Sequence, residues 1–225
     1  MWSCLRRPRR TKHRGDSRAN NHPVRSGARQ RRPSNQDPPR SPYCHEVPRQ
    51  CPEKKAEAIL TECASEANFK INEELFGEGK SLPESECNKE PNVQNKTANT
   101  WKQHLGNLKH AAAFICVRKR LAEEFPGNFA IEPRYRKDDV TKELLLTDRW
   151  LGSQRPDVVL HFTRNATRIQ CIYDFKFPCD IADRRDPLSD PHTQAQLLKY
   201  KDLGNENCLP AVVTPSLGIS RLPAP

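Results

Sequence analysis

Three short stretches of the sequence carry side chains that together could act on a phosphodiester bond. They contain Asp157, then Asp174 and Lys176 with one residue between them, and Gln196 further along the chain. Carboxylates are hard oxygen ligands of the kind that Mg²⁺ prefers, and a protein-bound Mg²⁺ usually keeps several waters and contacts substrate phosphates. A lysine beside the metal would orient the attacking water and stabilise the charge that grows at phosphorus. These residue types suit metal-dependent hydrolysis, provided that the fold brings them to one point.

Two adjacent strands are expected to bring the carboxylates together. The apolar run at 158–162 is typical of a buried strand, and residues 168–177 are predicted to form its partner after a hairpin turn at 164–166. Side chains alternate along a strand, so Asp174 and Lys176 share one face. The turn would place Asp157, at the start of the first strand, near Asp174.

A helix near the C-terminus is expected to supply the remaining part. Asp190 followed by Pro191 is typical of a helix start, because aspartate caps the first turn and proline suits its first position. The helix is predicted to run to Gly204, with Gln196 and Tyr200 four residues apart and hence on one face. These two side chains could hold the attacking water, the lysine or a phosphate.

The other elements complete a mixed α/β layer. A helix is predicted from Leu105 to Phe125, closed by the Pro-Gly pair at 126–127, and a short strand at 128–136 follows it. A last strand is expected at 209–214. The order is then helix, three strands, helix and strand, which predicts a mixed sheet with helices packed against it.

The order of these motifs resembles that of the PD-(D/E)XK superfamily of restriction-endonuclease-like nucleases. The resemblance consists of Pro156-Asp157, Asp174-Phe175-Lys176 and residues 196–200, which match the QxxxY element of several subfamilies. It covers about residues 101–214 and implies a restriction-endonuclease-like αβββαβ core. Within the superfamily, the run at 172–179 and the basic N-terminal part are similar to toxin domains of bacterial polymorphic toxins.

This resemblance implies metal-dependent cleavage of DNA by an antibacterial toxin or effector domain. Asp157 and Asp174 would hold the metal, with Mg²⁺ as the expected cofactor and Mn²⁺ as its alternative. Lys176 would be the catalytic lysine and Gln196 a supporting residue. A toxin of this kind would also have a cognate immunity protein as its partner.

The sequence departs from the superfamily pattern in one respect. Many members add a glutamate from the first helix, but here the only acidic residues on that helix are Glu123 and Glu124, near its far end. Whether either of them joins the site stays open. The number of metals and the choice between DNA and RNA are also left undecided.

Composition divides the chain into three parts. Residues 1–52 are predicted to be a disordered arm, because they are rich in Arg and Pro and have little to bury. The first 50 residues hold 13 Lys and Arg against three acidic side chains, so the net charge of +10 comes from the arm. Such an arm suits a polyanion, or is simply solvated. Residues 53–100 are predicted to contain one or two amphipathic helices and a linker, and 101–225 the nuclease domain.

The nine cysteines are scattered and form no CxxC pair, which argues against a zinc–cysteine site. Cys116 and Cys171 lie in apolar segments, which favours reduced, buried thiols, although Cys44 and Cys51 are close enough in sequence to bridge. Neither a secretory signal nor a membrane span is expected. The sequence therefore favours a cytoplasmic location, or delivery into a target-cell cytoplasm by a specialised secretion system.

Two other functions stay open at this point. The chain could be a non-catalytic nucleic-acid-binding module whose arm supplies affinity through counterion release. It could also be a protein-interaction module, in which case the acidic and basic site residues would form a surface ion pair. His161 shares a face with Asp157 in a regular strand, but a structural role is favoured for it. Trp101 and Trp150 are expected to be core or lid aromatics rather than base-stacking platforms.

Overall fold

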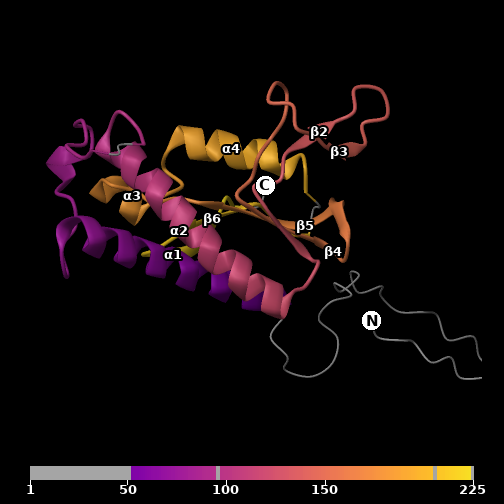
Figure 1. The fold of residues 1–225 in the computed structure, drawn as a ribbon. Coiled ribbons are helices and arrows are strands. Elements are labelled where there is room, and N and C mark those ends of the chain that lie inside the picture. The colour runs from indigo at the N-terminus through magenta and orange to yellow at the C-terminus, as the bar shows by residue number, and fades with distance from the viewer. Residues whose placement is uncertain (1–51, 95–96, 205–206, 224–225) are drawn as a thin grey trace, which may run out of the picture. The chain divides into compact units, whose positions relative to one another are not determined.

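The structure, a computed structural model, describes residues 52–94, 97–204 and 207–223 (Figure 1). They all belong to one unit of the chain, Arg40–Pro225. The arm predicted at the N-terminus lies outside the described residues, apart from its last position.

A five-stranded mixed sheet forms the centre of this unit. Its strands lie in the order β1 (Phe129–Ile131), β4 (Val158–Phe162), β5 (Asn165–Phe175), β6 (Ala211–Thr214) and β7 (Gly218–Arg221). Neighbouring strands are antiparallel except for β5 and β6, which run parallel. Tyr173 of β5 lies between Val158 of β4 and Ala211 of β6, so β5 is a central strand with partners on both sides.

Helices cover both faces of the sheet, which gives three layers (Figure 1). On one face lie α1 (Pro52–Phe76) and α2 (Trp101–Glu124), and the alternate residues Tyr173 and Phe175 of β5 point into the core beneath them. α4 (Pro191–Lys201) covers the opposite face, which has a second hydrophobic core. The predicted α/β class, with a mixed sheet flanked by helices, is therefore confirmed.

α1 is a single helix and is part of the same packed unit as the sheet. Its buried residues Leu60 and Ala64 share one core with Val117 and Leu121 of α2 and with the strands. The loop expected at 77–100 thus connects two parts of one body. Among the described residues, no helix is both long enough and apolar enough to cross a membrane.

The elements that carry the site motifs follow the predicted order. The strand expected at 158–162 is β4, and α4 begins after Asp190, whose carboxylate accepts hydrogen bonds from amides of the first turn. The hairpin turn comes earlier than expected, at residues 163–164, so β5 starts at Asn165. The described residues also contain elements that the sequence analysis does not predict. These are η1 (Glu84–Glu86), β3 (Leu144–Leu146), α3 (Ile181–Arg185) and β7. The single strand expected at 128–136 is instead two short strands in different sheets, β1 and β2 (Tyr135–Lys137).

The cysteines correct one prediction, because six of them form disulfides instead of remaining reduced. The bridged residues lie 53, 92 and 37 positions apart, and spacing along a sequence does not indicate pairing of this kind. The bridge considered between Cys44 and Cys51 lies outside the described residues. The pairs are Cys63–Cys116, Cys87–Cys179 and Cys171–Cys208.

Candidate active site

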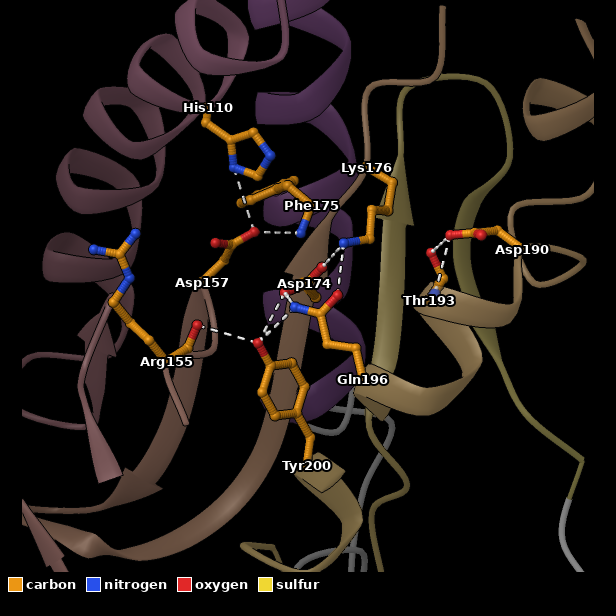
Figure 2. Close-up of polar contacts among 10 residues, drawn as sticks. All are labelled: His110, Arg155, Asp157, Asp174, Phe175, Lys176, Asp190, Thr193, Gln196 and Tyr200. Carbon is orange, nitrogen blue, oxygen red and sulfur yellow. Dashed lines mark hydrogen bonds and ion pairs between the residues drawn. The ribbon is translucent and has the colours of Figure 1, made fainter. Parts of the chain in front are cut away.

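The two carboxylates lie at the end of the sheet where β4 begins and β5 ends. Val158 pairs with Tyr173, and the residues next to this pair are Asp157 and Asp174. A carboxylate oxygen of Asp157, Oδ2, accepts a hydrogen bond of 2.7 Å from the backbone amide of Phe175 (Figure 2). The antiparallel register therefore brings the first two predicted site residues together, as the hairpin argument expects.

Asp174, Lys176 and Gln196 form a closed set of contacts. The amino group of Lys176 lies 2.6 Å from Oδ2 of Asp174 and donates to Oε1 of Gln196 at 2.8 Å (Figure 2). Nε2 of Gln196 donates to Oδ1 of Asp174 at 3.0 Å. Asp174 is only 3% exposed, whereas the Lys176 side chain is 32% exposed, so the carboxylate is buried and the ammonium is partly open to solvent.

α4 supplies Gln196 and Tyr200 from one face. The hydroxyl of Tyr200 accepts from Nε2 of Gln196 at 2.7 Å and lies 3.3 Å from Oδ1 of Asp174. It also lies 3.1 Å from the carbonyl oxygen of Arg155, so its single proton can donate either to this oxygen or to Asp174 (Figure 2). Tyr200 therefore links α4 both to Asp174 of β5 and to the segment that precedes Asp157.

His110 of α2 completes the site and is missing from the sequence analysis. Its Nδ1 lies 3.3 Å from Oδ2 of Asp157 (Figure 2). Its ring makes edge contacts with Phe114 and Phe177 at centroid distances of 5.7 and 5.2 Å. The available signal was the pairing of His110 with Phe114 four residues on, which places both side chains on one helix face. Nothing in the sequence indicates that this face meets the start of β4.

The two aspartates, if both are ionised, carry more negative charge than the nearby lysine can balance. Burial raises the pKa of Asp157 well above its ordinary value, and the Asp174 carboxylate adds to this, while the Phe175 amide and Lys176 act in the opposite direction. Burial lowers the pKa of His110 to about 4, so its imidazole is neutral at pH 7. With both aspartates ionised, two carboxylates would face one nearby ammonium.

The donor set fits a divalent cation, because such an ion would compensate the charge of two neighbouring carboxylates. Asp157 and Asp174 are the residues that would hold it. A second group of metal-ligating types consists of Glu53 of α1, Cys171 of β5 and Cys208 before β6. Those two sulfurs are bonded to each other, so they are not available as thiolate ligands.

The structure places the other residues considered in the sequence analysis away from this site. Glu123 and Glu124 are exposed at the C-terminal end of α2. They follow His110 by 13 and 14 positions, which corresponds to about 20 Å along a helix axis. His161, at the opposite end of β4 from Asp157, is buried with Nδ1 2.9 Å from the carbonyl oxygen of Phe162, in agreement with a structural role.

The tryptophans differ in their surroundings. Trp101 packs against Phe76, with ring centroids 5.6 Å apart, as expected for a core aromatic. Trp150 is 74% exposed, and the guanidinium of Arg134 lies 3.8 Å from its ring centroid. The core alternative for Trp150 is therefore wrong, and its place in a lid stays a prediction.

Comparison with known proteins does not add to this geometry. No protein-family model matches the chain, and no curated protein or solved structure is significantly similar to it.

Proposed function

We propose that the protein is a metal-dependent nuclease that hydrolyses phosphodiester bonds in DNA. The observation that carries this proposal is that Asp174, Lys176 and Gln196, which come from separate elements, contact one another, while Asp157 is bonded to the amide of Phe175, the residue between Asp174 and Lys176. The elements α2, β1, β4, β5, α4 and β6 follow the helix–strand order of a restriction-endonuclease-like core, with β2, β3 and α3 inserted between them. That order supports the same proposal at the level of the fold.

The metal would have a defined place and task. Held by Asp157 and Asp174, Mg²⁺ or Mn²⁺ would polarise the phosphoryl oxygen and lower the pKa of a coordinated water. His110 contacts the same oxygen of Asp157 that accepts from the Phe175 amide, with its Nδ1 3.3 Å away. Since the imidazole is neutral, this contact leaves the charge of the carboxylate for the metal.

Lys176 stabilises the reacting phosphate in this proposal. Its amino group contacts both Asp174 and Gln196, which orient its charge toward the carboxylate pair. Gln196 uses both ends of its amide, since its oxygen accepts from Lys176 and its nitrogen donates to Asp174. Negative charge that grows on the phosphate during attack would be stabilised by the ammonium held there.

A cleft gives a substrate access to Lys176. Its volume is about 390 Å³, and Lys176 lines it together with Lys102 and Gln103 from the first turn of α2. Asp180, Asp183 and Asp190 also line it, so the wall carries charges of both signs. The lysine side of the cleft is where a sugar-phosphate backbone would pass.

Cleavage of supercoiled plasmid tests the proposal. The wild-type protein is expected to convert supercoiled DNA to relaxed and linear forms with Mg²⁺ and to leave it intact with EDTA. Lys176→Ala is expected to lower the rate about 100-fold or more, as the loss of a group that stabilises transition-state charge does. Asp174→Ala is expected to abolish cleavage, because it removes a metal ligand.

A matched control distinguishes catalysis from general charge effects. Lys199 is exposed on α4, so Lys199→Ala removes the same charge outside the site and should cleave at the wild-type rate. Folded Lys176→Ala protein that still cleaves at that rate would end the assignment. A parallel reaction with single-stranded RNA of the same length decides between DNA and RNA as substrate.

The role of an antibacterial toxin belongs to the same proposal and rests on the resemblance of the 172–179 run to toxin nucleases. Induced expression in a bacterial cytoplasm is expected to stop growth and degrade chromosomal DNA. The Lys176→Ala protein, expressed to the same level, should allow growth. Equal growth of both strains at equal expression would remove the toxin role while leaving the nuclease proposal to the plasmid assay.

A further inference from the structure

A second cavity lies between the helical layer and the segment that follows β5. Its volume is about 250 Å³, and its polar lining includes Asn68 and Asn72 of α1, Lys109 of α2 and Arg184 of α3. Phe177 lines it as well and contacts the His110 ring, so this side chain lies between the cavity and the candidate active site. None of the four polar side chains takes part in the site described above.

Lys109 is an unusual residue to find in such a place. It is 5% exposed, and its amino group donates to Oδ1 of Asn68 at 2.7 Å. Among the described residues no carboxylate pairs with it. Burial, with a smaller contribution from Arg184, lowers its pKa to about 8, so the ammonium is still mostly charged at pH 7. A buried charge without an opposite partner is costly to a fold.

Arg184 adds a second cation to the same cavity. Its guanidinium donates to two backbone carbonyls, those of Pro178 and Cys179. Within the described part of the chain it forms no ion pair with a carboxylate either. Two positive charges therefore share a cavity whose protein lining supplies no matching negative charge.

Asn72 adds a hydrogen-bond acceptor to the residues that line the cavity. Its Oδ1 is buried and has no hydrogen-bond partner in the described structure. A buried acceptor of this kind is usually satisfied by a donor. A ligand that suits the cavity would thus carry negative charge for the two cations and a hydroxyl for Asn72. Hydrogen phosphate and phosphate monoesters in their monoanionic form have both, whereas a phosphodiester in the middle of a nucleic-acid strand has no hydroxyl on phosphorus.

We propose that this cavity binds a phosphate group, either inorganic phosphate or the terminal phosphate of a nucleotide. The bound anion pairs with Lys109 and Arg184, and a phosphate hydroxyl donates to Asn72. Hydrogen phosphate, with two negative charges, balances both cations, and a monoanionic monoester balances one of them. The inference does not depend on the nuclease proposal, because it uses residues outside the carboxylate site.

Isothermal titration calorimetry of the full-length protein at pH 7 in chloride buffer tests it. The probes are inorganic phosphate, thymidine 5′-monophosphate and, as an uncharged reference, thymidine. Saturable binding of phosphate or of the nucleotide is expected, and Lys109→Met should weaken it at least tenfold. Lys119→Met makes the same charge change on the exposed surface of α2 and should bind like the wild type. Tighter binding of the nucleotide than of phosphate would identify the nucleotide as the source of the phosphate group, and the reverse would identify the free anion.

Two results would overturn the proposal. One is the absence of saturable binding of both charged probes to folded wild-type protein at millimolar concentration. The other is wild-type affinity in a folded Lys109→Met variant, with folding checked by circular dichroism. If that variant does not fold, Arg184→Gln gives the same two readings, because it removes the second cation while keeping a polar side chain.

Discussion

The charge of Asp157 is the residue-scale property that sets how the proposed site depends on pH. Burial and the neighbouring Asp174 raise its pKa above the ordinary value. A carboxyl must lose its proton to bind a metal, so protons and Mg²⁺ compete for it. Cleavage is therefore expected to increase as the pH rises through this pKa, and a higher Mg²⁺ concentration should move the acid limb to lower pH. Profiles of kcat/KM against pH at two Mg²⁺ concentrations measure this.

The raised pKa of Asp157 also makes the stability of the fold depend on pH. Because the folded-state pKa of Asp157 is raised, the folded protein binds this proton more tightly than the unfolded chain does. The stabilisation from this group is fully present below the unfolded pKa, about 3.9, and is lost as the pH rises through the folded pKa. Added Mg²⁺ should restore stability above that pH. If neither the acid limb of the pH profile nor the melting temperature changes with Mg²⁺ concentration, the result contradicts a metal at Asp157.

His110 is predicted to act through Asp157 as a positioning residue. Replacing a group that orients a metal ligand commonly lowers metal affinity about 10- to 100-fold. His110→Ala is therefore expected to raise the Mg²⁺ concentration for half-maximal cleavage by a similar factor. His110→Gln keeps a side-chain donor and should recover part of the loss. A purely structural role predicts instead a lower melting temperature with an unchanged Mg²⁺ dependence in both variants.

At the scale of elements, α4 determines where Gln196 and Tyr200 lie. Asp190 fixes its start, since the carboxylate accepts from the amide of Thr193 at 3.0 Å and from its hydroxyl at 2.8 Å (Figure 2). Asp190→Ala is expected to cost about 1 kcal/mol of unfolding free energy, as the loss of such a cap does. Cleavage should fall several-fold and not vanish, because the frayed turn directly precedes Gln196.

Urea denaturation and the plasmid assay measure the two effects of this substitution. Asp190→Asn is the matched control, because asparagine caps a helix about as well as aspartate. It removes the negative charge and keeps the cap, so near wild-type stability is expected. If the alanine variant unfolds at the same urea concentration as the wild type, α4 does not depend on this cap.

The elements also show what a sequence can and cannot indicate. The start of α4 and the β4–β5 pair were predictable, because an Asp-Pro cap and apolar runs around a turn are local signals. The register of that pair then brought Asp157 to Asp174. His110 was not predictable in this way, since its contact depends on how α2 crosses the sheet edge. α3 and β7 are short, and tertiary contacts rather than propensity determine such elements.

At the scale of the whole molecule, three disulfides cross-link elements that lie far apart in the sequence. Cys63–Cys116 links α1 to α2, and Cys171–Cys208 links β5 to the segment before β6. Cys87–Cys179 ties the end of η1 to the chain beyond Lys176, where the two cavities share their wall. None of these pairs is visible as a local pattern, which is why the expectation of reduced thiols failed. Bridges of this kind are typical of proteins that fold in oxidising compartments.

The stability of the fold is expected to depend on these bridges. A disulfide that closes a long loop contributes about 2 to 4 kcal/mol, and the total stability of a domain is only about 5 to 15 kcal/mol. Since about 1 kcal/mol moves the melting temperature of a domain of this size by roughly 2 to 4 °C, removing one bridge should lower it by about 5 to 15 °C. The double substitution of Cys63 and Cys116 by Ser measures this for a bridge remote from the proposed site.

Reductant then tests how the fold and the proposed reaction are related. In native protein without reductant, a thiol-labelling reagent followed by mass spectrometry should leave the six bridged cysteines unmodified. With reductant, the melting temperature should fall by more than it does when any single bridge is removed. Plasmid cleavage should fall in parallel with the folded fraction, because one of the bridged cysteines, Cys179, follows Lys176 by only three positions. A cytoplasmic site of action requires that enough folded protein survive this treatment at 37 °C. Labelling of all six cysteines in the native protein, with melting unaffected by reductant, would show instead that the thiols are free and that packing alone holds the layers together.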